Sequence, residues 1–199
     1  MRPILFNTDM VRAILEGRKT VTRRPIKPQP IAGVKKLYRT KYTDLWRTPG
    51  TDFWFEFQAP CVPGDVLWVR ETWGVASDLL GAVPGPVYMA DYSDEELLSL
   101  RKKRYRWRPS IHMPKEAARI FLRVTDVRAE RLHDINVDPP GPKNQVVREG
   151  FHYLSDFVAV WERTIKPSDR ALYGWEANPW VWVIEFERIN RPPEGETDA

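Results

Sequence analysis

Three segments of alternating side chains most constrain the fold of this chain. They cover residues 65–72, 120–125 and 180–187. In the last one, alternate positions place Trp180, Trp182, Ile184 and Phe186 on a single face. A period of two matches a β-strand, whose successive side chains point to opposite faces. The sequence therefore predicts a sheet built on these strands, and a Pro63-Gly64 turn leads into the first of them.

Shorter helices and a hairpin complete the predicted pattern. The first helix follows Thr8, which can cap it, and ends at Gly17, which suits a left-handed position. Ser93 and Glu96 form a capping box for a helix reaching Arg104. Further helices are expected after Ser155 and, as a short turn, over 115–118, and a hairpin is expected to pair 37–42 with 53–57. Short strands with interspersed helices indicate a β-dominated α+β fold.

Length and composition indicate one globular domain. The chain has 199 residues, of which 42% are hydrophobic, and nine are Trp. We predict a single domain over 1–190 and a disordered tail over 191–199. The N-terminus lacks the apolar core of a signal peptide and no run is long enough to span a membrane. Cys61 is the only cysteine, so no internal disulfide is expected and the cytoplasm is the expected compartment.

Basic residues gather in two places, although the net charge is only +4. One cluster runs over 18–27 and the other over 101–108. The second interleaves cations with aromatic residues, a composition that suits single-stranded RNA. Its candidate nucleic-acid contacts are Arg101, Lys102, Lys103, Arg104 and Trp107. The alternative is a solvated helix end, with Trp107 as a lid or packing residue.

The most informative motif lies at residues 18–24, which contain one Lys, two Thr and three Arg. In an extended chain Thr20, Thr22 and Arg24 share one face, and Val21 and Arg23 share the other. Hydroxyl groups beside fixed cations can bind an anion or supply an activated nucleophile. A solvated basic surface strand is the alternative interpretation of the same residues.

Several motifs in the same order resemble the ASCH domain family, in particular the larger members carried by bacteriophages and prophages. The motifs are Ile4-Leu5-Phe6, residues 17–24, 63–73 and 109–114, Val124-Thr125-Asp126-Val127, Glu149-Gly150-Phe151 and residues 173–183. The resemblance implies a PUA-like fold, which is a small β-barrel with flanking helices. Compared with a small amidohydrolase of this family, the chain carries two insertions, over 26–62 and 74–108.

The resemblance also implies a catalytic set. The small amidohydrolase removes the acetyl group from 4-acetylcytidine, and its proton acceptor, nucleophile and proton donor fall on Lys19, Thr22 and Glu149. A Thr hydroxyl needs a nearby base. A Lys serves as that base only if its pKa falls from about 10.4 towards 7 or 8. Phosphate contact without catalysis is the alternative for Lys19 and Thr22, and an ordinary helix-end carboxylate is the alternative for Glu149.

The candidate pocket around this set has five further residues, namely Arg18, Arg24, Glu71, Trp73 and His112. Glu71 is a second candidate acid or a partner for Lys19 or Arg24, and His112 is either a pocket residue or a structural one. The spacing of His and Cys predicts no metal site, and no cofactor motif is present. The expected function is recognition of a nucleoside or an RNA base, with hydrolysis of acylated cytidine as the most concrete activity. The alternatives are a non-catalytic module that binds RNA or another partner, and a ribonuclease. The sequence leaves the oligomeric state open.

Overall fold

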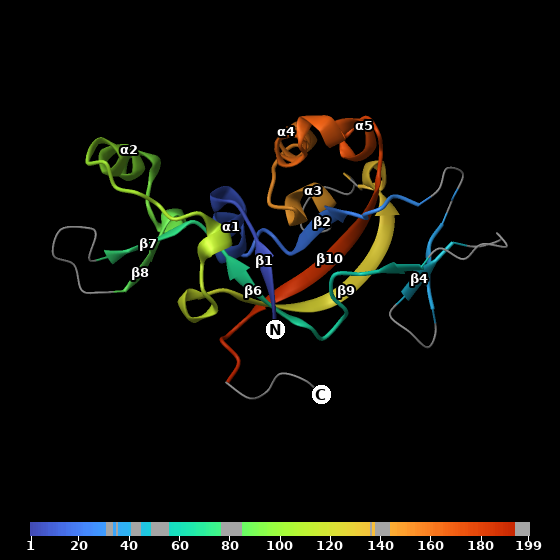
Figure 1. Cartoon of the computed structure of the whole chain (residues 1–199), viewed down its shortest axis with the longest axis horizontal. Coiled ribbons are helices and arrows are strands. Elements are labelled where there is room, and N and C mark those ends of the chain that lie inside the picture. Colours follow the sequence, from blue (N-terminus) through green and yellow to red (C-terminus); the bar gives the residue numbers. More distant parts are fainter. Residues whose placement is uncertain are drawn as a thin grey trace. The chain divides into compact units, whose positions relative to one another are not determined.

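The computed structural model of this chain shows a mixed α+β fold (Figure 1). It describes residues 1–30, 34, 36–40, 45–48, 56–76, 85–135, 137 and 144–193. The predicted disorder of the tail falls mostly on 194–199, which lie outside these residues. Arg191 is described, and its guanidinium lies 5.7 Å from the ring centroid of Phe121.

The largest sheet has five strands in the order β1-β6-β9-β10-β2. Their bounds are β1 Arg2–Leu5, β6 Val66–Arg70, β9 Phe121–Arg131, β10 Trp180–Ile189 and β2 Val21–Pro25. Strands β1 and β6 run parallel, whereas β6 with β9 and β10 with β2 are antiparallel. The three alternating segments thus form β6, β9 and β10, as predicted. Within the described residues this sheet ends at β1 and β2 and does not close into a barrel.

The chain divides into two compact units, each built from separate stretches of sequence. Unit 1 contains residues 1–17, 65–123 and 188–199, and unit 2 contains 18–64 and 124–187. Strands β9 and β10 each cross a boundary between the units. One domain over 1–190 remains a prediction.

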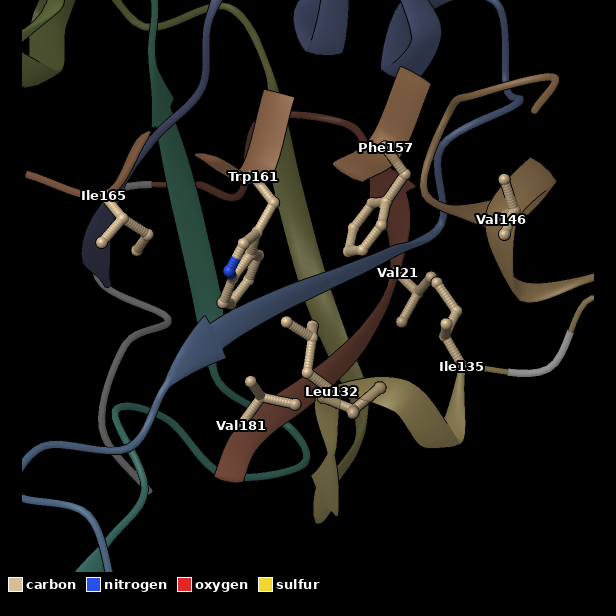
Figure 2. Close-up of a cluster of buried hydrophobic side chains, with 9 residues drawn as sticks. Val21, Leu132, Ile135, Val146, Phe157, Trp161, Ile165 and Val181 are labelled. Carbon is tan, nitrogen blue, oxygen red and sulfur yellow. The ribbon is translucent and has the colours of Figure 1, made fainter. Parts of the chain in front are cut away.

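The core of unit 2 lies between a helix and the sheet. Helix α4 (Leu154–Thr164) points Phe157 and Trp161 towards Val21 and Val181 (Figure 2). These residues belong to a buried cluster that also includes Leu132, Ile135, Val146, Ile165 and Val183. The apolar stripe predicted after Ser155 is therefore the packing face of α4, although the helix begins one residue earlier, with Tyr153 at its N-cap. Short elements complete this unit: η5 (Leu132–Asp134), α3 (Gln145–Arg148), η6 (Pro167–Asp169) and α5 (Arg170–Tyr173).

The predicted hairpin in unit 2 is wrong in its pairing. Strand β4 (Leu45–Arg47) lies between β3 (Tyr38–Arg39) and β5 (Glu56–Gln58) and pairs with both. The chain therefore makes a three-stranded meander. The indole of Trp46 packs edge-to-face on that of Trp182, with ring centroids 5.5 Å apart, so burial of an aromatic residue accounts for the additional strand.

Unit 1 contains α1 (Thr8–Leu15), β7 (Trp73–Val75), β8 (Pro86–Tyr88) and α2 (Asp94–Lys102). Asn7, and not Thr8, caps α1, because its side chain accepts a hydrogen bond from Met10 N at 2.8 Å. Gly17 has a φ of 75° as expected, and the capping box of α2 is present. Three short turns complete the unit: η2 (Met89–Asp91), η3 (Ser110–His112) and η4 (Lys115–Ala117).

In the part of the chain that the structure describes, no helix combines the length and apolar character needed to cross a membrane.

Candidate functional site

Residues 18–20 hold the C-terminal end of α3. Arg18 Nη1 donates to Gly150 O at 2.8 Å, Lys19 Nζ donates to Glu149 O at 2.9 Å, and Thr20 N donates to Arg148 O at 2.8 Å. The last carbonyls of a helix lack intrahelical donors, and cations near them are favourable. The motif therefore has a structural role, because its hydrogen bonds hold α3 and Glu149 in place.

Lys19 and Glu149 form a buried ion pair. Lys19 Nζ lies 2.7 Å from Glu149 Oε2, and the two side chains are 0% and 2% exposed. Lys19 Nζ also donates to Val21 O at 2.8 Å, the carbonyl of the peptide that leads into Thr22. Two of the three residues in the predicted catalytic set are thus in direct contact.

Arg23 binds the other oxygen of the same carboxylate. Its Nη1 donates to Glu149 Oε1 at 3.0 Å, and its Nη2 donates to Gln145 Oε1. Nη2 also lies 3.6 Å from Glu130 Oε2. Glu149 is therefore fixed between two cations, each on a different oxygen.

The Arg23 guanidinium retains one unused donor. Its Nε is buried and has no hydrogen-bond partner among the described residues, and neither does Glu130 Oε2. A buried donor without an acceptor costs free energy, about 1–3 kcal/mol. Such a group is expected where a water molecule or a bound ligand supplies the missing atom.

Thr22 and Arg24 lie on the other face of β2. The antiparallel register pairs Thr22 with Ile184 and Arg24 with Trp182, whereas Val183 pairs with Arg23. Thr22 is buried and Arg24 is partly buried. The alternation predicted for residues 20–24 is therefore seen. The candidate pocket around Lys19, Thr22 and Glu149 is not open to solvent, because the three residues are all about 2% exposed.

Burial dominates the electrostatics of this cluster. It lowers the pKa of Lys19, the ion pair with Glu149 opposes that shift, and the charges of Arg24 and Arg23 add to it. Burial likewise lowers the pKa of Arg24, and Glu149 opposes the shift. The lowered pKa makes the neutral amine of Lys19 easier to form than that of an exposed lysine.

A second network stabilises the same elements. Arg148 Nη2 donates to Glu185 Oε2 at 2.6 Å, and Arg148 Nε donates to Thr20 Oγ1 at 3.1 Å. Arg128 donates to both Glu185 and Glu130. Strands β9 and β10, α3 and the start of β2 are thus joined by charge-assisted bonds.

Three predicted pocket residues lie in unit 1 and have other partners. Both oxygens of Glu71 are bound by Arg119, at 2.9 and 3.0 Å, so pairing with Lys19 or Arg24, one of the two roles predicted for Glu71, is not seen. The Arg119 guanidinium matches the carboxylate with two parallel bonds, one to each oxygen. Burial raises the pKa of Glu71, and the hydrogen bonds from Arg119 oppose the shift.

Trp73 and His112 have local roles in the same unit. Trp73 belongs to a buried cluster with Trp68, Tyr88, Met113, Ala118 and Phe121, and the Arg108 guanidinium lies 5.0 Å from its ring centroid. His112 is exposed on η3. Arg101, Lys102, Lys103 and Arg104 are also exposed, and Trp107 is partly exposed. The structure thus brings Arg18, Arg24 and the catalytic set into unit 2, and places the other candidates in unit 1.

Contact of Arg23 with Glu149 was not predicted from the sequence, and Gln145 and Arg119 were not predicted as site residues. The sequence did contain a signal for Arg23. Alternation places Arg23 on the same face of the strand as Val21, and Val21 packs in the core. An arginine on such a face requires a buried acid. Gln145 and Arg119 gave no such signal, because neither lies in a patterned segment.

No family model, curated protein or solved structure matches this chain. Among the described residues no group of three or more His, Cys, Asp or Glu side chains could hold a metal ion.

Proposed function

We propose that unit 2 carries a site that recognises a nucleoside or an RNA base and hydrolyses the amide of an acylated cytidine. The observation that supports the proposal is the buried 2.7 Å hydrogen bond between Lys19 and Glu149, together with the bond from Lys19 Nζ to Val21 O, the carbonyl that leads into Thr22. A base and an acid in contact are two of the parts that amide hydrolysis requires, and the third, the hydroxyl group of Thr22, has to approach Lys19 when the site opens. The sequence resemblance to ASCH proteins supports the same roles, and with them we propose a PUA-like ancestry for the fold.

The first half of the proposed reaction uses the pair in its neutral form. Lys19, as a neutral amine, takes the proton of the Thr22 hydroxyl while Oγ1 attacks the acyl carbon. Glu149, as a neutral acid, gives its proton to the leaving nitrogen, and the C–N bond breaks. The products are an acyl ester on Thr22 and the free amine of cytidine, with Lys19 and Glu149 now both charged.

The second half restores the site. Glu149 takes a proton from water, which attacks the ester carbon, and Lys19 returns its proton to Thr22 Oγ1. One water is consumed and one carboxylic acid is released, so the proton count is balanced. The charges of Arg23 and Arg24 help to lower the pKa of Lys19, which favours the neutral amine that the first half requires.

Burial sets a requirement on this mechanism. Lys19, Thr22 and Glu149 have almost no exposed surface, so an acyl group reaches them only if the contacts between residues 18–20 and α3 open. We therefore expect substrate to increase hydrogen exchange at the amide of Thr20, which donates to Arg148 O.

The test is turnover of acylated cytidines by the purified protein, together with three variants. Thr22→Ala should lose activity by about 10³-fold or more, and Thr22→Ser should retain measurable activity. Lys19→Arg keeps the charge but cannot act as a neutral base, so it should also be inactive. Absence of turnover in the wild-type protein would remove the hydrolase proposal.

A non-catalytic binding module is the alternative, and one observation favours it. Lys19, Arg23 and Glu149 satisfy one another and cap α3, which is what a purely structural ion network does. Under this alternative the protein binds RNA or another partner without turnover. A ribonuclease would be recognised in the same assay by cleavage of an RNA strand.

A further inference from the structure

One strongly basic surface of unit 1 has no part in the proposed hydrolysis. It consists of Arg101, Lys102, Lys103 and Arg104 at the C-terminal end of α2, and of Arg106. We call it the α2 basic surface. All five side chains are exposed, and none forms an ion pair with a described residue. The acidic residues of α2 lie in its first turn, at the other end of the helix.

The backbone holds this surface in a fixed conformation. Lys103 N donates to Ser99 O at 3.1 Å, and Tyr105 N donates to Leu100 O at 3.0 Å. Arg104 then adopts a φ of 60°, which turns the chain away from the helix. A pair of backbone bonds between Arg108 and Trp73, 2.8 and 3.2 Å long, fixes the far end. Binding to such a surface requires little ordering of the backbone.

Aromatic residues alternate with these cations along the chain, since Tyr105 and Trp107 flank Arg106. Trp107 packs edge-to-face on Tyr105 and on Tyr92, with centroids 4.9 and 5.4 Å apart. All three rings are partly exposed. Cations that follow a phosphate chain, next to aromatic rings that contact bases, are the pattern of sites for single-stranded nucleic acid.

We propose that the α2 basic surface binds the phosphate chain of single-stranded nucleic acid, with Trp107 in contact with a base. This inference rests on the proposed function in one respect, since it adds an acylated cytidine within an RNA strand to the free nucleoside as a substrate.

An anionic membrane fits the surface less well. Helices that bind membranes carry a broad apolar face opposite a basic one. The only large apolar residue exposed on α2 is Leu98, so the helix lacks such a face.

The experiment measures binding of a fluorescent single-stranded RNA of about twelve nucleotides by anisotropy, at salt concentrations from about 50 to 200 mM. The variant Arg101→Gln/Lys102→Gln/Lys103→Gln removes three charges from the surface. The matched control Lys115→Gln/Arg163→Gln/Lys166→Gln removes three exposed charges elsewhere. Circular dichroism verifies that both variants are folded.

Binding by the wild-type protein should weaken steeply with salt. In the surface variant the slope of log K against log salt should be shallower by about 2, because each lost phosphate contact accounts for about 0.7. The control should keep the wild-type slope. Equal weakening in both variants, or binding to phosphatidylserine vesicles without binding to RNA, would overturn the proposal.

The two proposals fail separately. Thr22→Ala should bind RNA as the wild-type protein does, and the surface variant should hydrolyse free acylated cytidine at the wild-type rate. If the protein shows no turnover but binds RNA in a charge-dependent way, only the proposed hydrolysis is wrong. If it shows turnover but does not bind RNA, only the proposed role of the α2 basic surface is wrong.

Discussion

At the scale of single residues, Glu149 determines how the site is organised. Its two oxygens are bound by different cations, Lys19 and Arg23, and all three side chains are buried. A buried ion pair contributes little to stability compared with well-packed apolar residues. Loss of one partner is nevertheless strongly destabilising, because the other charge remains buried without a counterion. The cluster should therefore be sensitive to any single substitution.

Arg23→Gln tests that statement. The change removes the bond to Glu149 Oε1 and leaves the Glu149 carboxylate with one cation, so we expect the free energy of unfolding to fall by about 3–5 kcal/mol. Denaturation in urea measures it. Arg163→Gln is the control, since Arg163 is exposed and bonds only a carbonyl of its own helix, at 3.2 Å, and its effect should stay within about 0.5 kcal/mol. A loss below about 1 kcal/mol for Arg23→Gln would contradict a tightly coupled cluster.

At the scale of elements, close contacts explain why some residues cannot be replaced. Gly74 in β7 is the clearest case, because a Cβ at this position would lie 1.9 Å from the Tyr105 hydroxyl oxygen. Tyr105 in turn packs against Trp107 and donates to Val75 O at 3.3 Å. The glycine is thus needed to let the segment after α2 approach β7.

Gly74→Ala should therefore destabilise the protein by about 1–3 kcal/mol, the range for overpacking a tight contact. Gly85→Ala is the matched control, because a Cβ there meets no atom within 4 Å. Thermal unfolding compares the two variants. If Gly74→Ala and Gly85→Ala behave alike, Tyr105 does not occupy the position described above.

The network around Glu185 predicts a dependence of stability on pH. Burial opposes ionisation of Glu185, but hydrogen bonds from Arg148 and Arg128 outweigh it and lower its pKa. A carboxyl whose pKa is lower in the folded state stabilises the protein above its unfolded pKa of about 4.3. That contribution is lost as the pH falls from there through the folded pKa.

The midpoint of urea unfolding at pH 7, 4 and 3 should therefore fall more steeply in the wild-type protein than in Glu185→Gln. Glu176→Gln serves as the control, because it removes an exposed carboxyl outside this network. Parallel curves for the wild-type protein and Glu185→Gln would show that the network does not couple protonation to folding.

At the scale of the whole molecule, the periodic elements could be predicted from the sequence, whereas contacts between residues far apart in the chain could not. Strands β6, β9 and β10 and the capping box of α2 follow from local pattern. The position of β4 between β3 and β5 depends on packing of Trp46, which no local pattern reports.

The candidate site shows the same division. Contact between Lys19 and Glu149 was predicted from the family resemblance, and the structure places them 2.7 Å apart. The partner of Glu71 could not be predicted, because Arg119 lies 48 residues away in an unpatterned segment. Burial of the set was not predicted either, since it arises from the way residues 18–20 hold α3.

The most direct test of the proposed chemistry is to trap the acyl group. The wild-type protein is mixed with 4-acetylcytidine, quenched in acid and digested, and its peptides are measured by mass spectrometry. We expect the peptide containing Thr22 to gain the mass of one acetyl group, and the gain to disappear in Thr22→Ala. An acetyl group on Lys19 or on any other residue, or release of cytidine at the wild-type rate by Thr22→Ala, would contradict it.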